Sequence, residues 1–127
     1  MTKPKLNVRL LRKIQKMILE EPRRLNMWLV QNHYSKRDVD NSEYNLPPCG
    51  TVGCIAGWAL NLSGFTRSNS LNKAATLLGI ERTASDHVFL VSDWPEKFHN
   101  RYNDARTQRQ KARVTSNRID YLIKHGE

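Results

Sequence analysis

The chain has 127 residues and a formal net charge of +9. This length suits one domain with a core of ordinary size. No apolar run approaches the roughly 20 residues that a membrane-spanning helix needs, and no apolar segment follows the first lysines as it would in a signal peptide. Two cysteines in such a chain indicate reduced thiols. The composition therefore predicts a cytoplasmic protein with no membrane partner.

The positive charge is concentrated at the two ends of the chain. Residues 1–24 contain eight bases and two acids, residues 25–100 contain six and seven, and residues 101–127 contain seven and three. Such an excess attracts phosphate groups or acidic protein surfaces. We expect an acidic partner, with nucleic acid as the first candidate and a protein as the second. The alternative is that these charges only solvate exposed helix faces.

The first expected helix follows a short basic tail, residues 1–6. Asn7 is a suitable N-cap, and the apolar residues from position 8 to position 18 recur every three or four residues. Pro22 ends this helix near position 21. A second, short helix is expected over about 25–31, with Trp28 facing inward.

A polar loop then covers residues 32–49. Its length without a periodic pattern indicates a functional or mobile segment.

Eleven residues in the middle of the chain, Cys49-Gly50-Thr51-Val52-Gly53-Cys54-Ile55-Ala56-Gly57-Trp58-Ala59, include both cysteines and half of the six glycines. We call residues 49–59 the cysteine–glycine block. A helix over about 52–62 is expected here, and it is apolar on almost every side, which is typical of a buried central element. Its small residues would let another helix approach closely. The residues that define the block are Cys49, Gly50, Thr51 (the expected N-cap), Gly53, Cys54, Gly57 and Trp58.

Further helical segments follow the block. Ser70 can cap a helix over 71–78, and Gly79 can end it in the left-handed conformation. Another helix is expected over about 84–91, although the apolar run 88–91 also fits a buried strand.

Pro95 suits the first turn of a short helix in which Phe98 and Tyr102 share one face. The last expected helix begins at about Asp104, a suitable cap, and ends at His125. Together the patterns predict an all-α fold in which five or six helices surround the buried helix at about 52–62. We expect residues 1–127 to form one such domain.

The cysteine–glycine block permits a catalytic interpretation beside a purely structural one. Cys54, in the first turn of the expected helix, would feel the positive end of the helix dipole, which lowers the pKa of a thiol. His87 or His33 could then act as the base. Free N–H groups at the same helix start could instead bind an anion. The structural interpretation is a buried sulfur in contact with Trp58, one turn further on.

The sequence predicts no metal site and no cofactor. The two cysteines are separated by four residues, whereas zinc sites and thioredoxin-like motifs use two. The four histidines are scattered singly, so they do not complete a ligand set with the cysteines.

Basic residues recur with helical spacing near both ends of the chain. Arg106, Arg109 and Arg113 would form one ridge of the last helix, and Lys111 and Arg118 a second ridge nearby. If the two terminal helices pack side by side, their bases form one patch suited to phosphate contacts. Without a helix-turn-helix or an RNA-recognition pattern, such binding would address the nucleic-acid backbone and would be salt-sensitive. The candidate binding residues are Arg9, Arg12, Lys13, Lys16, Arg106, Arg109, Lys111, Arg113 and Arg118.

The cysteine–glycine block resembles the signature of a family of small uncharacterised bacterial and phage proteins, with the pattern Cys-Gly-Thr-x-x-Cys-Ile-Ala-Gly-Trp-Ala. The resemblance covers most of the chain and implies one mainly helical domain, but it implies no activity. It extends to Glu21-Pro22, Met27-Trp28, Leu77-Leu78-Gly79-Ile80, Phe89, Trp94-Pro95 and the closing segment 118–123.

Two functions thus follow from the sequence as hypotheses. The first is a small basic helical protein that binds an acidic partner. The second is a cysteine-dependent enzyme in which Cys54 is the nucleophile and His87 the candidate base.

Overall fold

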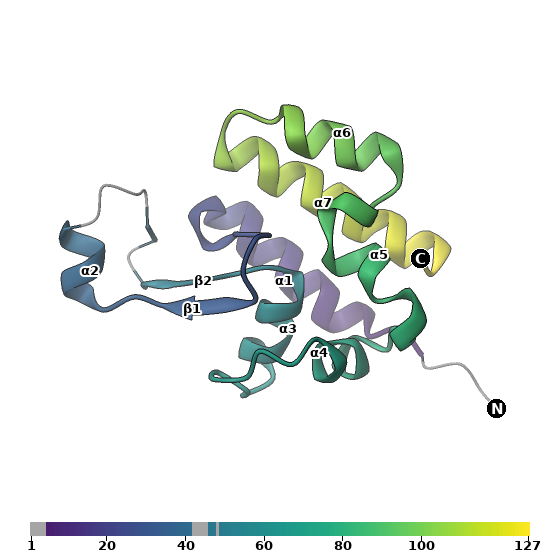
Figure 1. Cartoon of the computed structure of the whole chain (residues 1–127), viewed down its shortest axis with the longest axis horizontal. Coiled ribbons are helices and arrows are strands. Elements are labelled where there is room, and N and C mark those ends of the chain that lie inside the picture. Colours follow the sequence, from purple (N-terminus) through teal and green to yellow (C-terminus); the bar gives the residue numbers. More distant parts are fainter. Residues whose placement is uncertain (1–4, 42–45, 48) are drawn as a thin grey trace.

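The computed structural model describes residues 5–41, 46, 47 and 49–127. Within these ranges the chain forms seven α-helices, three short 3₁₀ helices and one antiparallel pair of strands (Figure 1). The predicted mainly helical domain is confirmed, but the strictly all-α prediction with five or six helices is wrong. None of the described helices is both long enough and apolar enough to cross a bilayer.

The first and last helices, α1 (Val8–Glu20) and α7 (Gln108–His125), lie side by side and antiparallel (Figure 1). The predicted apolar stripe of α1 is buried, and the Asn7 side chain caps the helix by accepting from the Leu10 N–H at 3.1 Å. Such a cap stabilises a helix by about 1 kcal/mol. A long-range contact fixes the pairing, since Gln15 on α1 donates to the Ser116 carbonyl on α7 at 2.8 Å.

The last helix begins later than predicted. Asp104 is the final residue of α6 (Glu96–Asp104), and Thr107 caps α7 instead. Thr107 and Gln110 form a reciprocal capping box, in which each side chain accepts from the other residue's backbone N–H. This pair satisfies two N–H groups of the first turn, so the chain breaks between the two helices at residues 105–107.

Helix α3 (Ile55–Leu62) is the central element, as predicted. All six residues from Ile55 to Leu60 are buried, and the helix packs against α1, α4 (Leu71–Leu78) and α5 (Asp86–Phe89). The predicted start at Val52 with Thr51 as the cap is wrong, because Cys54 is the N-cap. The preceding residues form strand β2 (Thr51–Gly53), which pairs with β1 (Gln31–His33).

The helix predicted over 25–31 is not formed. A 3₁₀ helix, η1 (Pro22–Arg24), leads instead into a turn that wraps the start of α3. Carbonyl groups of this turn and of η1 accept hydrogen bonds from the block. The Cys54 N–H donates to the Leu29 and Val30 oxygens at 3.1 Å. The Trp58 indole N–H donates to the Arg24 carbonyl at 2.9 Å. A helix would use these carbonyls within the segment.

The polar loop predicted over 32–49 contains the end of β1 and the short helix α2 (Lys36–Asn41), which stands apart from the other helices in Figure 1. Residues 42–45 and 48 of this loop lie outside the described residues, as do residues 1–4 of the expected basic tail.

The region after α3 follows the predictions in part. Ser70 caps α4, and Gly79 ends it with a φ of +73°, as predicted. The helix predicted over 84–91 is broken into η2 (Arg82–Ala84), α5 and η3 (Val91–Asp93), because Leu90 is extended. Phe98 and Tyr102 are both buried, but each ring packs edge-on against another partner, Tyr121 and Trp94 respectively.

Candidate functional site

Four exposed cations on the two terminal helices form the main candidate site, and we call Arg12, Lys16, Arg109 and Arg113 the basic face. Contacts between α1 and α7 at the basic face fix how the two helices align. Arg12 Nη1 lies 2.6 Å from Asp120 Oδ1, and the buried Gln15 donates to the same carboxylate oxygen at 2.9 Å.

Helical spacing relates the other three cations to this contact. Asp120 contacts α1, and Arg113 and Arg109 precede it by seven and eleven residues, close to whole numbers of turns. Lys16 follows Arg12 by about one turn on α1. The terminal helices pack side by side, as the predicted basic patch requires, and the patch itself stays a prediction.

The remaining candidate bases lie elsewhere. Arg9 and Lys13 are also exposed on α1, and Arg106 is exposed in the link before α7, where its N–H donates to the Gln110 side chain. The predicted ridge that included Arg106 is therefore shorter by one residue.

The second predicted ridge of α7 is wrong, because it does not face water. Lys111 is half-buried with its Nζ 5.8 Å from the Tyr102 ring of α6, and Arg118 is 1% exposed. Both positions fall on the stripe that also contains Thr115 and Leu122, which are fully buried. In the sequence, the spacing of Arg118 by three and four residues from Thr115 and Leu122 indicates that it lies on the buried face of α7.

Trp28 also departs from its prediction, since its side chain is 77% exposed. Its turn adjoins the start of α7, where the Gln108 side chain donates to the Leu25 carbonyl at 2.9 Å. The Met27 main chain is hydrogen-bonded to the Tyr102 hydroxyl of α6, and Met27 is itself buried. Trp28 is exposed in the same turn, between these contacts and the rest of the segment.

The Cys54 thiol lies in the core and not in a cleft. The residue is 4% exposed, and its sulfur accepts the Gly57 N–H at 3.4 Å. Burial raises the pKa of the Cys54 thiol, and the hydrogen bonds from Gly57 and neighbouring N–H groups oppose this only in part. The predicted lowering of this pKa by the helix dipole is therefore wrong in sign, and the thiolate that a nucleophile requires is disfavoured.

The backbone of the block is committed to internal contacts. The Gly50 N–H donates to Pro47, the Cys54 N–H to Leu29 and Val30, and the Gly57 N–H to the Cys54 sulfur. The anion pocket considered from the sequence would need these N–H groups free. A Cβ atom on Gly57 would overlap the Val30 carbonyl oxygen, so the close approach predicted for a helix is made by a turn.

The two candidate bases are engaged elsewhere in the fold. The His33 ring contacts Thr51 Oγ1 and the Thr66 carbonyl at 3.0 and 2.6 Å. The His87 ring contacts the Asp93 carbonyl at 3.3 Å, at the edge of a pocket around Arg118. In the described ranges no three His, Cys, Asp or Glu side chains gather as a metal site requires, and both cysteines are free thiols.

Sequence reasoning missed Gln15, Asp120 and the outward position of Trp28. No family model, curated protein or solved structure matches the chain. The resemblance to the family of small bacterial and phage proteins stays a prediction.

Proposed function

We propose that the protein binds nucleic acid through the basic face, mainly by contacts to phosphate groups. The observation that carries this proposal is the presence of four exposed cations on two adjacent helices held in register by Gln15 and Asp120. The overall net charge of +9 strengthens the same attraction at longer range.

The acidic residues near this surface leave most of its charge available. Lys16 Nζ and Glu20 Oε1 are 4.0 Å apart with both side chains exposed, and a pair of this kind contributes about 0–1 kcal/mol. Asp120 neutralises Arg12 more closely. Among the described residues, Arg109 and Arg113 form no ion pair.

Trp28 favours nucleic acid over an acidic protein as the partner. An aromatic ring that is 77% exposed beside the start of a basic helix can stack on an unpaired base. Such stacking contributes about 1–3 kcal/mol per base and requires no particular sequence. We therefore propose single-stranded nucleic acid as the preferred form.

The test is a fluorescence anisotropy titration with a 20-nucleotide single strand and with a duplex of equal length. With four phosphate contacts to the single strand, affinity should fall on the order of 50-fold between 50 and 200 mM salt. Trp28→Ala should weaken binding to the single strand more than binding to the duplex, while Trp28→Phe retains most of the affinity. An equal loss of affinity for the single strand and for the duplex would contradict a stacking role for Trp28.

A matched pair of charge reversals separates the basic face from net charge alone. Arg109→Glu with Arg113→Glu should reduce affinity at least tenfold more than Lys36→Glu with Arg37→Glu. The second pair changes net charge equally on α2, away from α7 (Figure 1). Equal effects would contradict a defined face. If the unaltered protein fails to bind at 50 mM salt, nucleic acid is rejected and an acidic protein becomes the next candidate.

A further inference from the structure

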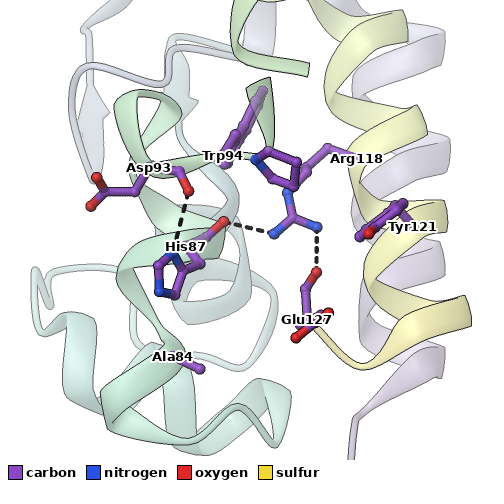
Figure 2. A pocket seen from close by; sticks show the side chains of 8 residues that line it. Ala84, His87, Asp93, Trp94, Arg118, Tyr121 and Glu127 are labelled. Carbon is purple, nitrogen blue, oxygen red and sulfur yellow. Dashed lines mark hydrogen bonds between the residues drawn. The ribbon is translucent and has the colours of Figure 1, made fainter. Parts of the chain in front are cut away.

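A pocket of about 280 Å³ lies between α7 and the segment that contains α5 and η3 (Figure 2). Its walls combine one cation with aromatic surface, and it does not share a residue with the basic face. The residues that matter here are His87, Asp93, Trp94, Arg118, Tyr121 and Glu127.

Arg118 presents a buried guanidinium to this pocket. Its two terminal nitrogens donate to main-chain oxygens, Nη2 to His87 at 2.7 Å and Nη1 to Glu127 at 2.9 Å (Figure 2). Its Nε is buried and has no hydrogen-bond partner in the described part of the chain. Burial lowers the pKa of Arg118, and Tyr121 and Glu127 oppose that change only in part.

This arrangement differs from that of the two arginines that form ion pairs among the described residues. Arg12 and Arg23 lie 2.6 and 2.9 Å from carboxylate oxygens of Asp120 and Glu21. Arg118 is far more buried but has no side-chain carboxylate bonded to it among the described residues, and the Asp93 carboxylate points away from it in Figure 2. A buried charge is costly unless it is paired and hydrogen-bonded.

The residues that line the pocket indicate which kind of ligand would fit beside the guanidinium. Trp94 and Tyr121 both line the pocket, and the guanidinium carbon lies 5.6 Å from the centre of the Tyr121 ring. Arg118 is the one lysine or arginine among the described lining residues, and Asp93 and Glu127 add negative charge nearby. A single planar cation in such surroundings suits a monoanion with a flat apolar body better than a doubly charged phosphate.

We propose that this pocket binds a small aromatic monocarboxylate, whose carboxylate takes the place of the Glu127 oxygen on Arg118 and whose ring packs against Trp94 and Tyr121. Only the Glu127 segment needs to move, because the contact between Arg118 and the His87 carbonyl can be retained.

The test is an NMR titration of the full chain with benzoate, with benzamide as the neutral matched ligand. Benzoate should give saturable shifts at the Arg118 Nε–H and at the amides of His87 and Tyr121, with Kd on the order of 1 mM. Benzamide should bind at least tenfold more weakly. Equal binding of benzamide, equal binding of inorganic phosphate, or shifts confined to the basic face would each overturn the proposal.

Variants then assign the contact to the pocket. Arg118→Lys retains the charge without the planar fork and should weaken benzoate binding at least tenfold, whereas Arg109→Lys on the basic face should leave it unchanged. If Arg118→Lys does not fold, Ala84→Phe provides the second arm, because Ala84 lines the pocket without contacting the guanidinium in Figure 2. Unchanged benzoate affinity in a folded Ala84→Phe protein would contradict the site.

Discussion

The cysteine–glycine block and the basic face are the two most unusual features of the protein, and they differ in their exposure to solvent. The block is buried from Val52 to Ala59, and its polar groups bond to the chain that wraps it. The basic face is exposed, and the contacts of Gln15 on α1 with Ser116 and Asp120 on α7 hold the two helices in register. The comparison teaches that an unusual motif can serve packing, while side chains that packing does not constrain remain available to a partner.

The largest expected effect is at Gly57, where packing is tightest. Gly57→Ala should destabilise the protein by more than about 3 kcal/mol, because the new Cβ overlaps the Val30 carbonyl and backbone must move. Gly57→Leu should fail to fold. Urea unfolding measures the change.

The matched control for Gly57 is Gly64→Ala. Gly64 has a φ of +92° but open space around it, so alanine there should cost about 1 kcal/mol from backbone strain alone. A Gly57→Ala protein as stable as this control would show that the block is not tightly packed.

The two cysteines should differ in reactivity by at least about 100-fold. Cys49 is exposed, whereas Cys54 is buried with a raised pKa and reacts only when the core opens. A thiol reagent should modify one cysteine in the native protein at pH 8. Cys49→Ser should abolish this rapid reaction and Cys54→Ser should preserve it. Rapid modification of Cys54 in the folded state would restore the enzyme hypothesis.

Alkaline pH should weaken the core. Burial raises the pKa of Tyr102 to about 12 from an ordinary 10. Between these values the unfolded chain has lost the proton and the folded chain retains it, so stability falls as pH rises, by at most about 2.7 kcal/mol. The raised pKa of Cys54 acts in the same direction from about pH 9.

Urea unfolding at pH 8 and pH 11 measures that decline, and Tyr102→Phe should reduce it. A decline that the variant leaves unchanged would assign the pH dependence to other groups.

The smallest expected effect is on the basic face. Arg109→Glu with Arg113→Glu should change the free energy of unfolding by no more than about 0.5 kcal/mol, because neither side chain is buried or ion-paired in the described part of the chain. Thermal unfolding checks this, and a loss of several kcal/mol would mean that these arginines hold the helices together.

The helices with long apolar periods could be predicted from the sequence, and α1, α4 and the buried half of α7 follow that pattern. The turn at 25–30 and the pairing of β1 with β2 could not. They depend on hydrogen bonds between Cys54 and Leu29 or Val30, which are distant in the sequence, and strands of three residues carry no periodic signal.

The residues of the candidate site could be predicted from the sequence, but which of their side chains face solvent could not. Arginine is rarely buried, so residue type placed Arg118 at the surface, although its phase on α7 places it between the buried Thr115 and Leu122. Trp28 shows the reverse case. Its apolar surface suggested burial, but the neighbouring contacts of Leu25 and Met27 fix a turn that directs it outward.

The antiparallel pairing of α1 and α7 has a consequence for biosynthesis. Gln15 and Ser116 are 101 positions apart, so the ribosome must synthesise the intervening segment before the two halves of the basic face can meet. A nascent chain that ends before Gln108 exposes only the cations of α1, together with an apolar stripe that has no α7 to cover it. Affinity for the proposed partner would thus be acquired only once α7 has been synthesised.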